Sequence, residues 1–301
     1  MKKNKKVITT ALVVGFIAST FSTQASAAAT ENKLVKELSN GFNELQHEVI
    51  ITEFSKYGVS MQELSDYTIA ANHQTPLALG VSGYEFFDNS EDMFVTPNYI
   101  LGEGVNLENK QKQVDKEVKR VVKSIIKKNM TEKQKHEAIY QYLVEKVKYD
   151  QTTFNKYKSG NTKTFSSAHS AYGALVDYVA VCQGITAAYK ALADEAGLKS
   201  IVVTGTHNGT PHTWNKVMVN GKWANLDATI KNNLVFATDE KAVTLKYKEN
   251  LDYAPDSEIA AGKYSTSGKP VKIETAIKEV VKEKPAQTTN TKAVYDKSVT
   301  A

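Results

Sequence analysis

A shortage of cysteine is the first informative feature of this 301-residue sequence, because Cys182 is its only one. A single cysteine cannot close a disulfide within the chain, and it excludes four-cysteine zinc sites. The histidines also lack metal-site spacing, since His136-Glu137 is not followed by the second histidine of an H-E-x-x-H motif. We therefore expect no metal and no other cofactor.

The sequence also lacks a long apolar run. Its stretch from Val7 to Phe21 is shorter than the roughly 20 residues of a spanning helix, and threonine and serine interrupt it. Four lysines precede this stretch and Ala25-Ser26-Ala27 follows it, which is the pattern of a secretory signal peptide with its cleavage site. We therefore expect residues 1–27 to be a signal peptide, the protein to be secreted, and no stable insertion into a membrane.

A strong excess of charge is missing as well. Loss of residues 1–27 would remove four lysines and no acid, so the formal charge would fall from +5 to +1. Such a balance gives no reason to expect nucleic acid as a partner. With 41% hydrophobic and 24% charged residues, the composition is that of a globular protein.

The first region of the expected mature chain, residues 28–105, shows both helical and strand patterns. Apolar residues recur with helical spacing over residues 34–45, and a strand-like run follows at 49–51. Ser60 and Glu63 form a capping box that predicts the start of a second helix. Two apolar segments within residues 79–100 predict a hairpin. This region is expected to be a small α+β unit.

The second region, residues 106–264, predicts helices followed by strands. We expect helices at residues 107–128, from Thr131 onward, at 171–178 and at 182–196, with a polar loop over 150–169. Strands are expected at residues 200–206, 212–219 and 222–228, with Asn208-Gly209 and Asn220-Gly221 as hairpin turns. Together with the first region this is an α+β fold, and residues 265–301 are expected to be a flexible tail.

Cys182 falls at the start of a predicted helix, where unpaired N–H groups and the helix dipole stabilise a thiolate. If Asn220-Gly221 is a two-residue turn, Val219 pairs with Lys222, and this register places His212, Trp214, Asp227 and Thr229 on one face of the sheet. An imidazole and a carboxylate on one face could activate the thiol.

Four stretches resemble one known family. They are Ser170 to Val176, Val181-Cys182-Gln183-Gly184, Pro211-His212-Thr213-Trp214-Asn215 and Gly221 to Thr229. Over about residues 107–240 the sequence is similar to the transglutaminase-like (papain-related) superfamily, and in particular to its secreted bacterial branch. The resemblance implies a papain-like core in which the nucleophile begins a helix packed on an antiparallel sheet.

The resemblance also implies roles for individual residues. Cys182 would be the nucleophile, His212 the base and acid, and Asp227 the residue that orients the imidazole. Thr213 stands where alanine is usual in this branch and is expected to flank the catalytic residues without touching them. The tryptophan that animal transglutaminases place upstream of the cysteine is absent, so Tyr172 and Gln183 are candidate oxyanion donors and Trp214 a candidate cleft residue.

The implied function is acyl transfer from a peptide or glutamine side-chain amide through a thioester on the cysteine, with an amine or water as acceptor. The expected partner is therefore a protein or peptide substrate, with a cell-surface substrate as one option. Three alternatives remain: a cysteine peptidase or cell-wall amidase with the same triad, a non-catalytic wall-associated binding or adhesion module, and a cysteine that is simply buried.

Overall fold

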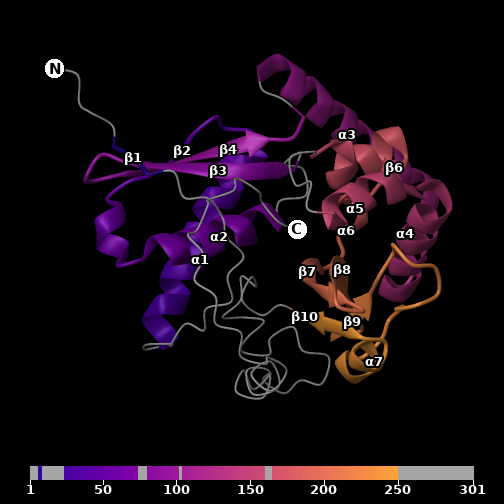
Figure 1. Ribbon diagram of the computed structural model, residues 1–301. Helices are drawn as coiled ribbons and strands as arrows, with labels where there is room; N and C mark the ends of the chain where they lie inside the picture. The colour runs from indigo at the N-terminus through magenta and orange to yellow at the C-terminus, as the bar shows by residue number, and fades with distance from the viewer. Residues whose placement is uncertain (1–5, 9–23, 74–79, 102–103, 160–164, 250–301) are drawn as a thin grey trace.

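The computed structural model describes residues 6–8, 24–73, 80–101, 104–159 and 165–249, which form two groups of elements side by side (Figure 1). The expected tail, residues 265–301, lies outside the described residues, as does most of the expected signal peptide. The first group consists of β1 (Lys6–Ile8), α1 (Gln24–Asn43), β2 (Val49–Ile51), a 3₁₀ turn (Phe54–Tyr57), α2 (Met61–His73), β3 (Val81–Asp88) and β4 (Met93–Tyr99).

The first group is an antiparallel sheet in the order β1-β3-β4-β2, with α1 and α2 packed together beside it. The predicted hairpin is confirmed as β3 and β4, and the predicted capping box is present because the Ser60 hydroxyl and the Glu63 carboxylate bond each other's backbone N–H groups. Leu38, Phe42 and Val95 contribute to a separate apolar core. Cleavage after Ala27 stays a prediction; it would remove the edge strand β1 and the first residues of α1.

The second group carries the predicted helices and the second sheet. Its elements are α3 (Gly104–Ile125), α4 (Glu132–Lys146), β5 (Lys148–Tyr149), α5 (Gln151–Lys158), a 3₁₀ turn (Ser167–His169), a π-helical turn (Gly173–Asp177), β6 (Val179–Ala180), α6 (Cys182–Glu195), β7 (Ser200–His207), β8 (Thr210–Val219), β9 (Lys222–Leu226), α7 (Asp239–Thr244) and β10 (Tyr247–Glu249).

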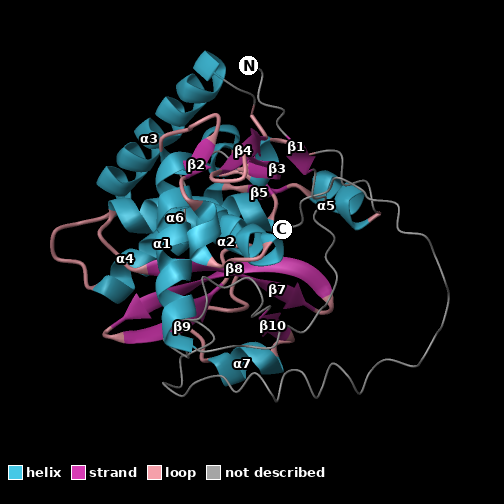
Figure 2. Cartoon of the chain, turned by 90° about the vertical axis from the view of Figure 1, so that its left-hand side faces the viewer, coloured by secondary structure: helices cyan, strands magenta, loops and turns pink. Residues whose placement is uncertain are grey.

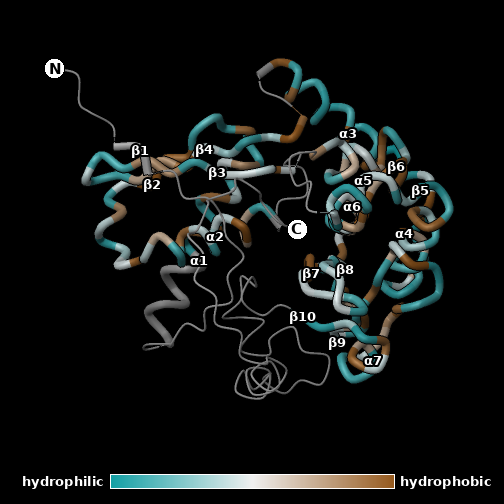
Figure 3. Tube along the Cα trace, in the orientation of Figure 1, coloured by the Kyte–Doolittle hydropathy of each residue, from teal (hydrophilic) through white to brown (hydrophobic). Residues whose placement is uncertain are grey.

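The second sheet is antiparallel, in the order β10-β7-β8-β9, and it is covered on both faces. Helix α6 packs on one face, and α7 lies on the other (Figure 2). The larger core joins α6 to α3 and α4 through buried residues such as Val118, Ile139 and Leu192. Along α3 the hydropathy alternates between apolar and polar stretches, as expected for a helix with one buried face (Figure 3).

The predicted strand register is confirmed. Val219 pairs with Lys222 and Asn215 with Leu226, so the turn consists of two residues. Asn220 and Gly221 have φ values of 52° and 74°, and Asn208 and Gly209 have φ values of 51° and 72°. Positive φ at both turn residues is the requirement of a type I′ hairpin, which asparagine followed by glycine satisfies with little strain.

Two local predictions are wrong. Residues 150–169 are not one polar loop, because Asp150 caps α5 by accepting a hydrogen bond from the Thr153 N–H, 3.0 Å away. The expected helix at 171–178 is a short π-helical turn that ends where Tyr178 adopts the left-handed conformation at φ 57°. No helix in the described ranges is long and apolar enough to cross a membrane.

His136 fastens α4 to both of its neighbours and supplies the first prediction. Its ring nitrogens lie 2.9 Å from the Tyr189 hydroxyl and 3.1 Å from the Met218 carbonyl oxygen, and burial lowers its pKa from 6.5 to about 4. The unfolded chain therefore takes up a proton before the folded protein does, and the free energy of unfolding should fall by about 3 kcal/mol as the pH drops from 6.5 to 4.

Urea unfolding at several pH values measures this effect. In His136→Asn the difference between pH 6.5 and pH 4 should shrink by about that amount, whereas replacement of the exposed His47 should leave it unchanged. An equal pH dependence in the parent and His136→Asn would refute the assignment.

Candidate active site

Three side chains from different elements meet at the edge of the second sheet. Cys182 begins α6, His212 lies in β8, and Asp227 directly follows β9. All three are buried, with exposed fractions of 5%, 7% and 0%. Nε2 of His212 lies 2.8 Å from Oδ2 of Asp227, so Nδ1 is the nitrogen left to face the thiol. The structure thus brings together the three residues that the motifs singled out.

A glycine allows the start of α6 to sit close to the chain segment beneath it. A Cβ atom at Gly184 would lie 2.4 Å from the Ala168 carbonyl oxygen and 2.8 Å from that of Ser170. Any larger residue would push the first turn of the helix away from this backbone. The Val181 N–H also donates to the Ala168 carbonyl oxygen, at 3.0 Å. The position of Cys182 is therefore fixed by backbone contacts on its own side of the helix.

The carboxylate of Asp227 receives more hydrogen bonds than the sequence suggested. Oδ1 accepts from the Thr229 N–H at 2.8 Å and from the Thr229 hydroxyl at 2.6 Å, and Oδ2 accepts from the Tyr247 hydroxyl at 2.6 Å as well as facing His212. Asn233 donates in turn to the Tyr247 hydroxyl, at 3.0 Å. Sequence analysis placed Thr229 on the right face, but it gave no signal for Tyr247 of β10.

The electrostatics of the three side chains favour charges on all of them. Burial lowers the pKa of His212, but Asp227 and Cys182 outweigh it and raise that pKa to about 10. Burial raises the pKa of Asp227, and its hydrogen bonds from His212, Thr229 and Tyr247 bring that pKa below its usual value. Burial likewise raises the pKa of Cys182, while His212 lowers it further, so the net shift is downward. An imidazolium between a thiolate and a carboxylate results.

Thr213 was expected to flank the triad without touching it, and this is wrong. Its backbone N–H and its side chain both interact with Cys182 and lower the pKa of the thiol. The Thr213 hydroxyl also lies 3.1 Å from the Thr186 hydroxyl, on the second turn of α6. The contact arises because successive residues of β8 face opposite sides of the sheet, and the side that Thr213 faces is the one covered by α6.

The other candidates lie in different places. The Tyr172 hydroxyl donates to Oε1 of Gln113, 3.3 Å away on α3, so it serves the helix packing. Trp214 donates to Oδ1 of Asn225 at 2.9 Å, and its ring stacks beside His212 with centroids 6.2 Å apart. Gln183 lines a pocket with Cys182, and its Oε1 is buried without a hydrogen-bond partner.

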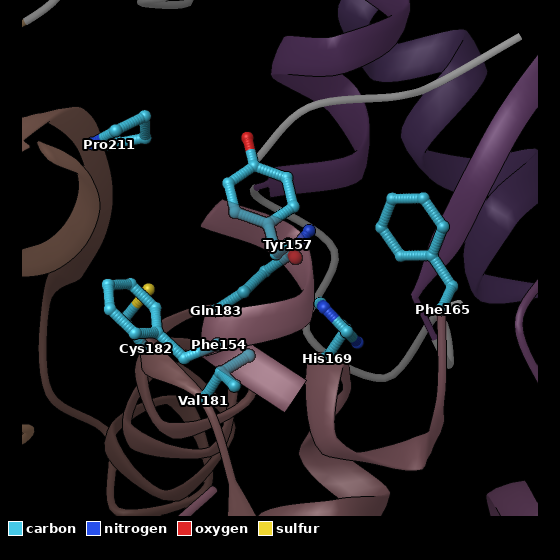
Figure 4. Close-up of a pocket in the computed structure, with 8 residues that line it drawn as sticks. All are labelled: Phe154, Tyr157, Phe165, His169, Val181, Cys182, Gln183 and Pro211. Carbon is cyan, nitrogen blue, oxygen red and sulfur yellow. The ribbon is translucent and has the colours of Figure 1, made fainter. Parts of the chain in front are cut away.

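The pocket beside Cys182 is walled mainly by apolar and aromatic groups (Figure 4). Phe154 and Tyr157 of α5 contribute to it, three residues apart on one side of the helix, and Phe165 and Pro211 complete the apolar wall. Sequence analysis missed this wall because it read residues 150–169 as a polar loop. The spacing of Phe154 and Tyr157 was the signal that could have revealed a helix with one apolar side.

Metal ligands do not cluster in the part of the chain that the structure describes. No group of three or more histidine, cysteine, aspartate or glutamate side chains is placed there to hold an ion. The charges at the site are therefore those of its own side chains, above all the thiol, the imidazole and the carboxylate.

Comparisons with known proteins follow from this geometry. Two solved structures are similar at low overall superposition: "Crystal structure of a TGase" (TM-score 0.35, 17% identity, 51% of this chain and 45% of that chain) and a candidate cysteine protease from Cytophaga hutchinsonii (TM-score 0.34, 18% identity, 56% of this chain and 60% of that chain). The chain thus spans about half the length of these proteins. No curated protein matches it.

The sequence over residues 119–228 matches the family model of the transglutaminase-like superfamily. This range includes the helix start at Cys182, the strand with His212 and the carboxylate of Asp227. The α+β architecture of the second group agrees with the predicted fold class. The chain therefore carries a transglutaminase-like superfamily domain, as its sequence motifs predicted.

Proposed function

We propose that this domain is a thiol-dependent enzyme that attacks a peptide or glutamine side-chain amide and holds the acyl group as a thioester on Cys182. The observation that supports it most is the buried line of Cys182, His212 and Asp227, in which Nε2 of the imidazole lies 2.8 Å from the carboxylate. The shifted pKa values of all three groups favour an ion pair ready for nucleophilic attack.

The chemistry runs in two halves. The Sγ thiolate forms a bond to the carbonyl carbon, and the π electrons of the carbonyl move to its oxygen. When that oxyanion collapses, the C–N bond breaks, and the leaving amine takes a proton from the His212 imidazolium. A second amine or a water then attacks the thioester while His212 accepts its proton, and the thiolate leaves. Asp227 keeps the ring oriented throughout, held by Thr229 and Tyr247.

Peptide-bond hydrolysis is the second candidate, and the pocket favours it. A glutamine side chain is polar, whereas the walls beside Cys182 are largely aromatic and suit an apolar residue next to the attacked amide. Mass spectrometry of the products separates the two reactions. Incorporation of a labelled primary amine into a glutamine-rich protein indicates transfer, and new N-termini indicate cleavage.

A non-catalytic binding module fits the site less well. Burial of a thiol, an imidazole and a carboxylate opposes their ionisation, and the structure offsets this with hydrogen bonds that a mere packing site would not need. We further propose that residues 1–27 direct secretion and that the substrate is a protein or peptide outside the cell, since the lysine-rich start and the small residues at 25–27 follow the signal-peptide pattern.

The pH dependence of thiol alkylation tests the proposal without any knowledge of the substrate. Because the pKa of Cys182 is lowered and that of His212 is raised to about 10, the thiolate should persist below the ordinary thiol pKa near 8.5. We expect iodoacetamide to label Cys182 at pH 6 about as fast as at pH 8. In His212→Ala the rate should instead climb through pH 8.5. A parent protein whose labelling also climbs only there would refute the catalytic reading.

A further inference from the structure

Tyr149 is brought to the nucleophile by a short pair of parallel strands that the sequence did not reveal. Strand β5 pairs with β6 so that Tyr149 lies opposite Ala180, two residues before Cys182. The Lys148 N–H donates to the Tyr178 carbonyl oxygen at 2.8 Å, and the Asp150 N–H donates to that of Ala180 at 2.9 Å. The backbone on both sides of Tyr149 is therefore fixed to the segment that leads into α6.

The Tyr149 side chain interacts with two groups of Cys182. Its hydroxyl forms hydrogen bonds with the thiol and with the backbone N–H of that residue. This N–H is in the first turn of α6, where backbone donors have no partner within the helix. The ring of Phe154 packs edge-on against Tyr149, with centroids 5.9 Å apart and an interplanar angle of 66°. The hydroxyl thus lies where the sulfur and the free N–H meet.

We propose that Tyr149 is a catalytic residue that completes the oxyanion hole, a role that rests on the proposed function. When the thiolate adds to the carbonyl carbon, the π electron pair moves to the carbonyl oxygen. That oxygen must lie within reach of the Cys182 N–H, and the Tyr149 O–H beside it supplies a second donor. Both donors keep their protons, and the amine still leaves with the proton from His212.

The protonation state of Tyr149 suits a donor. Burial first, and then the negative charge of Cys182, raise its pKa well above the ordinary value for tyrosine, so the hydroxyl keeps its proton at neutral pH. Two of the candidates named from the sequence are engaged elsewhere, since Tyr172 donates to Gln113 and Trp214 donates to Asn225. The contact with both the sulfur and the N–H of Cys182 distinguishes Tyr149 from them.

Two probes of Cys182 test the role in Tyr149→Phe. Acylation by p-nitrophenyl acetate passes through an oxyanion, whereas alkylation by iodoacetamide displaces iodide and forms none. We expect the maximal acylation rate, measured on the pH plateau, to fall about 100-fold. The maximal alkylation rate should change less than threefold. Tyr172→Phe, which removes a hydroxyl from the α3 contact, should leave both rates within twofold of the parent.

Each outcome decides the question. Equal losses of acylation and alkylation in Tyr149→Phe would mean that the residue only positions Cys182, and an unchanged acylation rate would mean that its hydroxyl has no part in the step. Both results overturn the inference and leave the thiol enzyme in place. If the parent is not acylated on Cys182, or Cys182→Ala is acylated equally, the proposed function fails together with the role of Tyr149.

Discussion

Replacing His212 with alanine should abolish turnover about as completely as replacing Cys182, with kcat lower by about 10⁴-fold or more for each. The two groups act as one unit, because the thiolate exists through its ion pair with the imidazolium. Release of ammonia or new N-termini from a peptide library, followed by mass spectrometry, measures the loss. An exposed histidine replaced in the same way, His47→Ala, should keep full activity.

Asp227→Asn should lose less than His212→Ala but still about 10³-fold. An asparagine presents an NH₂ group to one of the donors on Thr229, Tyr247 or His212, so it cannot accept all four hydrogen bonds that the carboxylate receives. Thermal unfolding must accompany the assay to show that the variant is folded. Small and equal losses in all three variants would instead favour a binding module.

Lys216→Ala should destabilise the domain by about 3–5 kcal/mol, the largest effect expected from a residue outside the site. Lys216 is 1% exposed, and its Nζ lies 3.0 Å from Oδ1 of Asp239 and 2.5 Å from Oε1 of Glu249. Burial lowers the pKa of this lysine, but the two acids outweigh it and leave the pKa raised. Removing the lysine leaves two carboxylates facing each other with no cation between them.

Urea unfolding measures this loss against a matched control. Lys222→Ala, at the exposed start of β9, should change the free energy of unfolding by less than about 0.5 kcal/mol. Because Glu249 and Tyr247 share β10, Lys216→Ala should also weaken the hydrogen bond from Tyr247 to Asp227 and lower turnover in the protein that remains folded. A loss below about 1 kcal/mol would show that the acids are solvated without the lysine.

The aromatic pocket shows how a local misreading changes a functional argument. Residues 150–169 contain many lysines, serines and threonines, and their average polarity suggested a loop. The Asp150 cap and the position of α5 against the site turn Phe154 and Tyr157 towards Cys182. A composition average hides two apolar residues on one side of a short helix, and only their spacing records them.

The sequence alone determined the parts of this protein that depend on neighbours in the chain. The capping boxes, the asparagine-glycine turns and the apolar spacing act over a few residues, so they predicted most helices, the register of β8 with β9 and the meeting of Cys182, His212 and Asp227. The tertiary structure decided what surrounds them. Tyr149 reaches the thiol through the pairing of β5 with β6, and Tyr247 reaches Asp227 only because β10 joins β7. Such contacts join residues 20 or more positions apart, and their partners are selected by packing free energy over the whole core, which no local pattern encodes.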